Sequence, residues 1–254
     1  MDINEIEALA NNGDTKAMVD VGNYYFQLNT GHDISIAAEW YEKAAEQGSA
    51  LGILHSMLAH AILAAAAEGV GAWELAYEDW DKVYDHADKF LDICNQLRAT
   101  NDVSSEENTA YSCRDDALYG VMKCFWHNKE YDNVTDIEIS DKDSAKIHVL
   151  YGLCLWREGK YREAIPHLQA VESDEYINTV KNDHDYMIYS ESAFLLSGVY
   201  RIGSTGLIPS DINKAKELLT SAYYHINNPV AKEIIAEELN KYQKKLFGGY
   251  KYIG

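Results

Sequence analysis

The sequence repeats a spacing of small and aromatic residues that is typical of paired helices. In the segment 14–48, Ala37, Trp40 and Ala44 lie three and four positions apart, which places them on one face of a helix. Gly31 separates this helix from the one before it. A single hairpin of two helices cannot bury its own apolar face, so it requires neighbours. The spacing therefore predicts a stack of helical hairpins.

Four later segments carry degenerate copies of this pattern. We expect helical hairpins near 51–97, 110–137, 144–171 and 186–226, in addition to 14–48. The sequence has only 3 prolines and no β-branched runs bounded by turn residues, so the predicted fold class is all-α. Together the five hairpins predict a single repeat domain over residues 1–254.

The segments outside the hairpins complete this prediction. Residues 230–247 predict an amphipathic helix that caps the final hairpin, because that hairpin has no following neighbour. The tail after it either folds back through its tyrosines or stays free for a partner, and the sequence favours neither. The polar stretch 98–109 predicts a mobile loop, and 172–185 predicts a second extension between hairpins.

Three of these segments resemble known helical repeats. The run WYEKAAEQG at residues 40–48 resembles a Sel1-like repeat, which is a relative of the tetratricopeptide repeat (TPR), and 194–224 resembles the same type. Residues 144–171 resemble an ordinary TPR. The resemblance implies a right-handed α-solenoid in which the first helix of each hairpin lines a concave groove. It also implies that this groove binds a peptide or protein segment.

The resemblance assigns particular side chains to that groove. The same slot of the repeat falls on Phe26, Trp126, Trp156 and Arg201, and nearby slots give Asn23, Tyr119, Lys123, Val149, Leu153, Arg157 and Phe194. A row of Trp, Tyr and Arg would suit an extended or helical peptide, since these residues dominate binding energies at interfaces. The alternative is that aromatic residues at helical spacing belong to the core. Lys123, Arg157 and Arg201 would suit an acidic segment or a carboxylate.

The acidic composition limits the classes of partner. The chain carries 41 Asp and Glu residues against 22 Lys and Arg, a formal net charge of -19. Such a surface repels phosphate backbones and anionic headgroups, so we expect no nucleic-acid partner and no membrane partner. The charge either serves solubility alone or attracts a protein with a basic surface.

No segment predicts export or membrane insertion. The first residues, MDINEIEALANNGD, lack the basic start and apolar core of a secretory signal. The apolar stretch 50–67 is rich in alanine and contains His55 and His60, which favours a buried helix over a membrane span. We therefore expect a cytoplasmic location.

No pattern of residues predicts catalysis. His55 and His60 are five positions apart and point to different sides of a helix, so they do not form a metal pair. The cysteines lack any C-x-x-C spacing and are expected to be free thiols packed as small apolar residues: Cys94, Cys113, Cys124 and Cys154. We expect no catalytic residue, metal or cofactor, and hence a non-catalytic interaction module. A self-associating structural protein and an unrecognised hydrolase are the alternatives, and the oligomeric state stays open.

Overall fold

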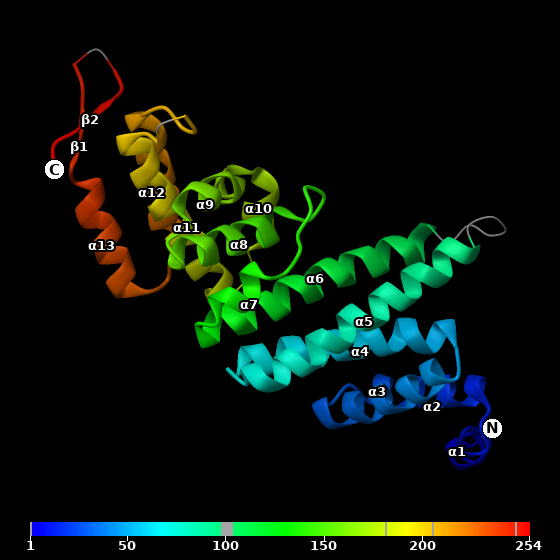
Figure 1. The fold of residues 1–254 in the computed structure, drawn as a ribbon. Helices are drawn as coiled ribbons and strands as arrows, with labels where there is room; N and C mark the ends of the chain where they lie inside the picture. The colour runs from blue at the N-terminus through cyan, green and yellow to red at the C-terminus, as the bar shows by residue number, and fades with distance from the viewer. Residues whose placement is uncertain (1, 98–103, 181, 205, 247) are drawn as a thin grey trace. The chain divides into compact units, whose positions relative to one another are not determined.

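The computed structural model describes residues 2–97, 104–180, 182–204, 206–246 and 248–254. It divides into two compact units, Met1–Asn128 and Lys129–Gly254. Helices dominate both units, and each helix packs against helices close to it in the sequence (Figure 1). This sequential packing of helix pairs confirms the predicted TPR-like, all-α fold class. A single domain over the whole chain stays a prediction, and the two units are described separately.

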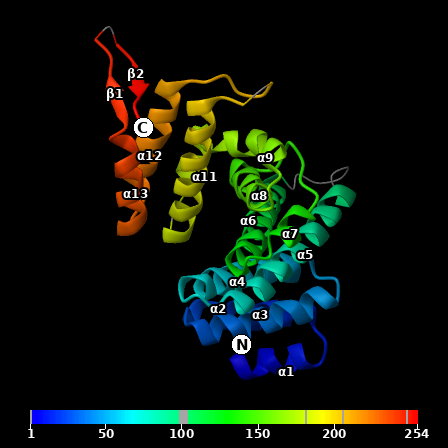
Figure 2. The same ribbon diagram turned by 60° about the vertical axis from the view of Figure 1, so that its left-hand side comes forward.

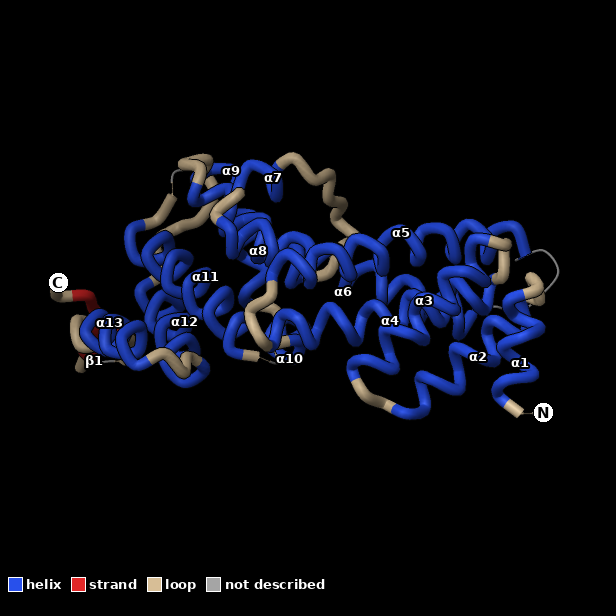
Figure 3. The backbone as a smooth tube through the Cα atoms, turned by 90° about the horizontal axis from the view of Figure 1, so that it is seen from below, coloured by secondary structure: helices blue, strands red, loops and turns tan. Residues whose placement is uncertain are grey.

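The first unit is built from helices that follow one another along the chain. Its described residues form α1 (Ile3–Asn11), α2 (Thr15–Leu28), α3 (Gly31–Glu46), α4 (Ala50–Gly69), α5 (Trp73–Leu97) and α6 (Ser104–Asn128). Each packs against the next, as Figure 1 shows, and Figure 3 shows the same helices in blue from below. The pairs α2–α3 and α4–α5 lie in the segments predicted as hairpins at 14–48 and 51–97. Helix α1 is an addition that the repeat pattern does not predict.

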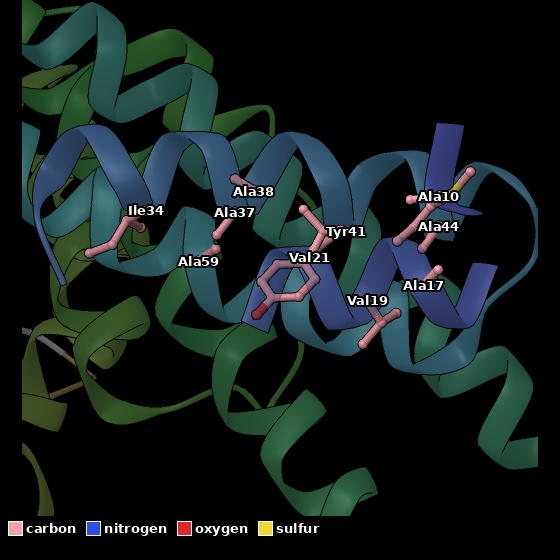
Figure 4. Packing of buried hydrophobic residues seen from close by; sticks show 11 residues of the cluster. Ala10, Ala17, Val19, Val21, Ile34, Ala37, Ala38, Tyr41, Ala44 and Ala59 are labelled. Atoms are coloured by element: carbon pink, nitrogen blue, oxygen red, sulfur yellow. The ribbon is translucent and has the colours of Figure 1, made fainter. Parts of the chain in front are cut away.

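Small residues bring the helices of the first hairpin close together. Figure 4 shows Ala37, Tyr41 and Ala44 of α3 in the packed interior of this unit, and all three are buried. A Cβ atom on Gly22 of α2 would overlap the ring of Tyr41, so a larger residue cannot be accommodated there without movement. The spacing found in the sequence therefore marks points of close approach between helices.

The second unit continues the same arrangement and ends in two short strands. Its described elements are α7 (Tyr131–Thr135), α8 (Ala145–Arg157), α9 (Tyr161–Leu168), the 3-10 helix η1 (Gln169–Glu172), α10 (Asp174–Thr179), α11 (Asp183–Ile202), α12 (Ile212–His225), α13 (Pro229–Leu239), β1 (Tyr242–Lys244) and β2 (Tyr250–Tyr252). The pairs α8–α9 and α11–α12 lie in or around the segments predicted as hairpins at 144–171 and 186–226. Figure 2 shows α11, α12 and α13 next to one another.

The hairpin predicted at 110–137 needs a correction. Its first helix, α6, belongs to the first unit, whereas its short second helix, α7, belongs to the second unit and packs against α8. The predicted loop at 98–109 also changes, because the chain is already helical from Ser104; residues 98–103 lie outside the described residues. The extension predicted at 172–185 contains α10 and the first turn of α11, and residue 181 is again outside the described part.

The C-terminal helix is shorter than predicted. Helix α13 ends at Leu239, and the following strands pair antiparallel, with Tyr242 opposite Tyr252. The rings of these two tyrosines meet edge-on at 5.2 Å, and the backbone N–H of Tyr250 donates to Asn213 Oδ1 on α12 at 2.9 Å. The tail thus folds back, which answers the question that the sequence left open. The predicted helix over 230–247 was wrong beyond Leu239 because cross-strand tyrosine pairs replace helical packing there.

Helix α4 is the one helix in the described ranges that is long and apolar enough to cross a membrane. It packs against α3 on one side and α5 on the other. Two of its polar residues, His60 and Glu68, are buried and bonded to charged groups of neighbouring helices. These contacts support the predicted assignment of residues 50–67 to a buried helix.

A buried ion pair links α4 to α6. The Lys123 ammonium lies 2.6 Å from Glu68 Oε2, and the indole N–H of Trp80 on α5 donates to Glu68 Oε1 at 2.8 Å. All three residues are buried. Removing one member of such a pair leaves a buried charge without its counterion, which is far less favourable than losing an exposed pair.

We expect Glu68→Leu to lower the free energy of unfolding by about 3–5 kcal/mol, because it removes the carboxylate that pairs with the buried ammonium of Lys123. The double variant with Lys123→Met should regain most of that loss, since both charges are then gone. Lys89→Met is the control, because Lys89 and Asp85 pair at the surface, and it should change stability by less than about 1 kcal/mol. Urea unfolding followed by circular dichroism measures the free energy of unfolding of all three variants. A double variant that is less stable than Glu68→Leu alone would contradict the interpretation.

A second polar network surrounds His60. Its Nδ1 lies 2.7 Å from Asp79 and its Nε2 lies 3.0 Å from Glu42, which also pairs with Lys82 at 2.9 Å. Burial alone would lower the pKa of His60, but the hydrogen bonds to Asp79 and Glu42 raise it above 6.5. The hydrogen bond from His60 in turn lowers the pKa of Glu42 to about 2. The ring of His86 faces that of His60 at 6.5 Å.

The stabilisation from His60 should depend on pH in a defined direction. Because its pKa is raised in the folded chain, the contribution is complete below pH 6.5 and is lost as the pH rises through the folded pKa. The contribution from Glu42 has the opposite sense: it is present above pH 4.5 and is lost as the pH falls towards about 2. The deficit of His60→Gln relative to the parent should therefore be largest between pH 4.5 and 6.5.

Urea unfolding at a series of pH values tests this expectation, with His32→Gln at the exposed start of α3 as the control. A His60→Gln deficit that grows above neutral pH would show that the ring is neutral in the folded chain.

Candidate functional site

The residues predicted for the groove lie in both units and differ in exposure. In the first unit, Asn23 and Phe26 are half-buried and line a small pocket. Trp126 is also half-buried, and its indole Nε1 is enclosed without a hydrogen bond to the described residues. Tyr119 and Lys123 are buried. Only some of the predicted positions are therefore open to a partner.

Tyr119 and Lys123 do not line a groove. Their prediction assumed a repeat register that is wrong for α6. The sequence pattern places the small position at Met122, which is fully buried. In the structure the close approach occurs at Gly120, where a Cβ atom would overlap the indole of Trp80. The ammonium of Lys123 lies 5.0 Å from the Tyr119 ring centre and pairs with Glu68, so both predicted side chains belong to the interior.

In the second unit, α8 carries four of the predicted residues. Val149 and Leu153 are fully buried, so their assignment to a groove wall is corrected. Trp156 is half-buried and meets the ring of Tyr161 edge-on at 4.8 Å. The last, Arg157, is exposed. The predicted alignment of Trp156 with aromatic residues of the first unit stays a prediction.

An apolar hollow of the second unit runs along α11 and includes Phe194. A pocket of about 230 Å³ lies between α11 and α13. A second pocket of about 250 Å³ adjoins it, since both share Met187, Ile226 and Asn228. We call the two together the α11 groove, lined by Asp183, Tyr186, Met187, Ser190, Glu191, Phe194, Ile226, Asn227, Asn228, Ala231, Ile234 and Ile235.

The walls of the α11 groove expose large apolar side chains. Met187 of α11 is 42% exposed and Ile234 of α13 is 53% exposed, whereas Ile235 beside it is buried. Phe194 is half-buried between them. Exposed apolar residues from two helices that converge on one hollow are typical of a binding site.

Acidic groups are fixed within the groove. The guanidinium of Arg157 donates to Glu191, and burial raises the pKa of Glu191 although the positive charge of Arg157 opposes this shift. At the other pocket, the amide of Asn227 donates to Asp183 at 3.0 Å. Arg157 thus lies beside the groove, but its charge is already used by the chain itself.

Arg201, the last predicted residue, contacts the C-terminal strands. Its guanidinium lies over the ring of Tyr252 at 4.4 Å and its Nε lies 3.8 Å from Glu238. The predicted receptor for an acidic segment is therefore engaged by the folded-back tail. With Lys123 and Arg157 also paired to carboxylates, none of the three predicted cations stands ready for an acidic partner.

The first unit has its own pocket, of about 160 Å³, lined by Asn23, Phe26, Tyr41, His55 and Leu58. The Tyr41 hydroxyl donates to Asn23 Oδ1 at 2.9 Å. Burial lowers the pKa of His55, whose Nδ1 is enclosed and has no hydrogen-bond partner in the described ranges. The pocket is thus a mixed apolar and polar recess at the adjoining faces of α2 and α4.

Several of these lining residues were not predicted. Met187, Ile226 and Ile234 escape the repeat count because they lie outside the slots of the first helix. The apolar spacing of α13 contains Ile234, but the sequence assigns that face to capping. His55 and Leu58 lie on a helix whose even apolar composition hides which face is open.

The described residues contain no group of three or more His, Cys, Asp and Glu side chains that could hold a metal ion. Burial raises the pKa of Cys113 to about 11 and that of Cys124 to about 12, and it raises the pKa of Cys154 further. These thiols therefore remain protonated near neutral pH and are poor nucleophiles.

Comparison with known proteins identifies two of the hairpins. The Sel1 repeat model matches residues 15–49 and 190–225. A solved structure, that of YrrB, described as a TPR protein with an unusual peptide-binding site, is 13% identical with a TM-score of 0.45, over 91% of this chain and 97% of that one. No curated protein sequence matches. The first matched segment covers α2–α3 and the second covers most of α11–α12, so one segment of each unit is similar to the Sel1 repeat.

Proposed function

We propose that this chain is a non-catalytic protein-interaction module that binds a peptide or protein segment in the α11 groove. The observation that carries the proposal is the convergence of exposed apolar residues from α11 and α13 on one hollow. Sel1 repeats are helical scaffolds, and their presence is consistent with a role in protein interaction.

The dimensions of the groove suit a short segment. Asp183 and Phe194 mark its two ends on α11, and eleven residues of helix span about 16 Å. That length accommodates about three turns of a helix or about five residues of an extended chain. A segment of this size would cover Met187 and Ile234, and removing their exposed apolar surface from water favours binding.

The polar groups of the groove select among apolar segments. Asp183 places a carboxylate at one end of it, whereas Glu191 is already paired with Arg157, and no Lys or Arg is among the residues that line the groove. A segment with an apolar anchor and a neighbouring basic residue would satisfy both features. This agrees with the expectation of a partner with a basic surface.

A catalytic role has less support. Burial keeps the thiols of Cys124 and Cys154 protonated, and the described ranges contain no cluster of side chains that could hold a metal ion. Self-association through the same groove is a distinct alternative, and it predicts a concentration-dependent mass. The cytoplasmic location expected from the sequence is part of this proposal.

Peptides selected from a displayed random library on the full chain should bind the α11 groove. We expect the double variant Met187→Glu with Ile234→Glu to bind the selected peptides at least tenfold more weakly, because it puts charge into the apolar walls. Leu246→Glu is the control, since Leu246 is exposed on the tail and lies outside the groove. Fluorescence anisotropy measures the affinities.

Equal losses in the double variant and in Leu246→Glu would contradict the assignment of the groove. Sedimentation velocity on the same proteins separates self-association: a dimer that dissociates only in the double variant would show that a second copy occupies the groove.

A further inference from the structure

Helix α4 exposes a face that carries no charge. Between Ala50 and Ala67 the sequence has no Asp, Glu, Lys or Arg. Leu58 is 36% exposed and Ile62 is 42% exposed, and Leu51 is exposed one turn or more before them. An exposed helix face in a soluble chain is ordinarily polar, so a continuous uncharged face marks a surface that is covered in use.

The three exposed leucine and isoleucine residues and the half-buried His55 form a single strip beside the pocket of the first unit. Leu51, His55, Leu58 and Ile62 are spaced by four, three and four positions, which places them along one side of α4. His55 and Leu58 also line the pocket that Asn23 and Phe26 of α2 complete. We define the α4 face as Leu51, His55, Leu58 and Ile62 of α4 together with Phe26 of α2. It spans about 16 Å along the helix and has a recess at its middle.

The charge of the first unit indicates what covers this face. Residues 1–128 contain 22 Asp and Glu against 7 Lys and Arg, a net charge of -15, whereas residues 129–254 contain 19 against 15, a net charge of -4. The acidity of the chain is therefore concentrated in the unit that holds the α4 face. Neither α4 nor α2 beyond Lys16 carries a cation that would repel a basic partner.

We propose that the α4 face docks a basic amphipathic helix of a partner protein, with apolar residues at helical spacing against α4 and with Lys or Arg on its flanks. A helix is the favoured form because the strip is straight, and ridges of apolar residues three and four apart pack into one another. One apolar side chain enters the pocket beside Phe26 and Leu58. The acidic field of the unit attracts the basic flanks and speeds encounter.

The α4 face is separate from the α11 groove, so the proposal for either surface can be disproved without affecting the other. The probe is a labelled model helix of about five turns made of Leu and Lys in an amphipathic order, added to the full chain. One matched probe replaces Lys by Glu, and another keeps the composition but scrambles the order. Fluorescence anisotropy at low and at high salt reports binding.

The decisive comparison uses two double variants of equal charge. Leu58→Glu with Ile62→Glu alters the α4 face, whereas Val70→Glu with Leu75→Glu alters exposed apolar residues elsewhere in the first unit. Attraction by charge alone predicts that both bind the Leu–Lys helix more tightly. Docking on the α4 face predicts that the affinity for the probe falls at least tenfold in the Leu58→Glu, Ile62→Glu variant and does not fall in the Val70→Glu, Leu75→Glu variant. Because the α11 groove is itself proposed to take an apolar segment with a basic neighbour, both double variants are also made together with Met187→Glu and Ile234→Glu, and the tenfold loss should persist in that background.

Several outcomes would overturn the proposal. These are equal binding by the two double variants, equal binding of the scrambled or Leu–Glu probe, and affinity that does not weaken with salt. A dimer that dissociates only when the α4 face is altered would assign the face to a second copy, and co-sedimentation with zwitterionic vesicles that the same variant abolishes would assign it to lipid. Leu58→Ala with Ile62→Ala is a milder variant, and thermal unfolding checks that it is folded. It should still bind the probe more weakly than the parent does.

Discussion

The ring of Tyr41 lies against the backbone at Gly22, and this contact determines how closely α2 and α3 approach. The indole of Trp80 meets Gly120 of α6 in the same way, and the backbone of α9 meets Gly152 of α8. Once two helices are this close, the apolar residues beside the contact are buried between them. The opposite faces are left for the next helix along the chain. Any face that finds no neighbour stays exposed, and both proposed binding surfaces are of this kind.

Apolar packing alone does not decide how α4 is oriented. The helix is apolar around its whole circumference, so several rotations about its axis would bury similar area. His60 and Glu68 remove this freedom, because each must meet charged partners: Asp79 and Glu42 for the first, Lys123 for the second. We interpret the two networks as the contacts that select one rotation. They thereby decide that Leu58 and Ile62 face outward.

The helical hairpins could be predicted from the sequence because their signals are local. Asp14 and Ser49 cap the helices that follow them, and Asn29 adopts the left-handed conformation between α2 and α3. The tail was mispredicted because Tyr242 and Tyr252 find each other across a turn, which no helical spacing reveals. Of the residues predicted for a groove, Asn23, Phe26 and Phe194 line pockets, whereas Val149 and Leu153 are interior. A period of 3.6 residues in the apolar pattern identifies the face of a helix that is packed. It does not tell whether that face packs against the chain itself or against a partner.

The two surfaces differ in what they can contribute to binding. The first unit has a high negative charge and an apolar face that carries no charged side chain, so it attracts basic partners at long range but discriminates weakly among them. The α11 groove lies in the unit of lower net charge, and it fixes Glu191 and Asp183 beside apolar walls. Charge at a distance mainly raises the rate of association, and matched contacts in a hollow mainly lower the rate of dissociation. Specificity in this chain should therefore lie in the second unit, and the salt dependence of binding in the first.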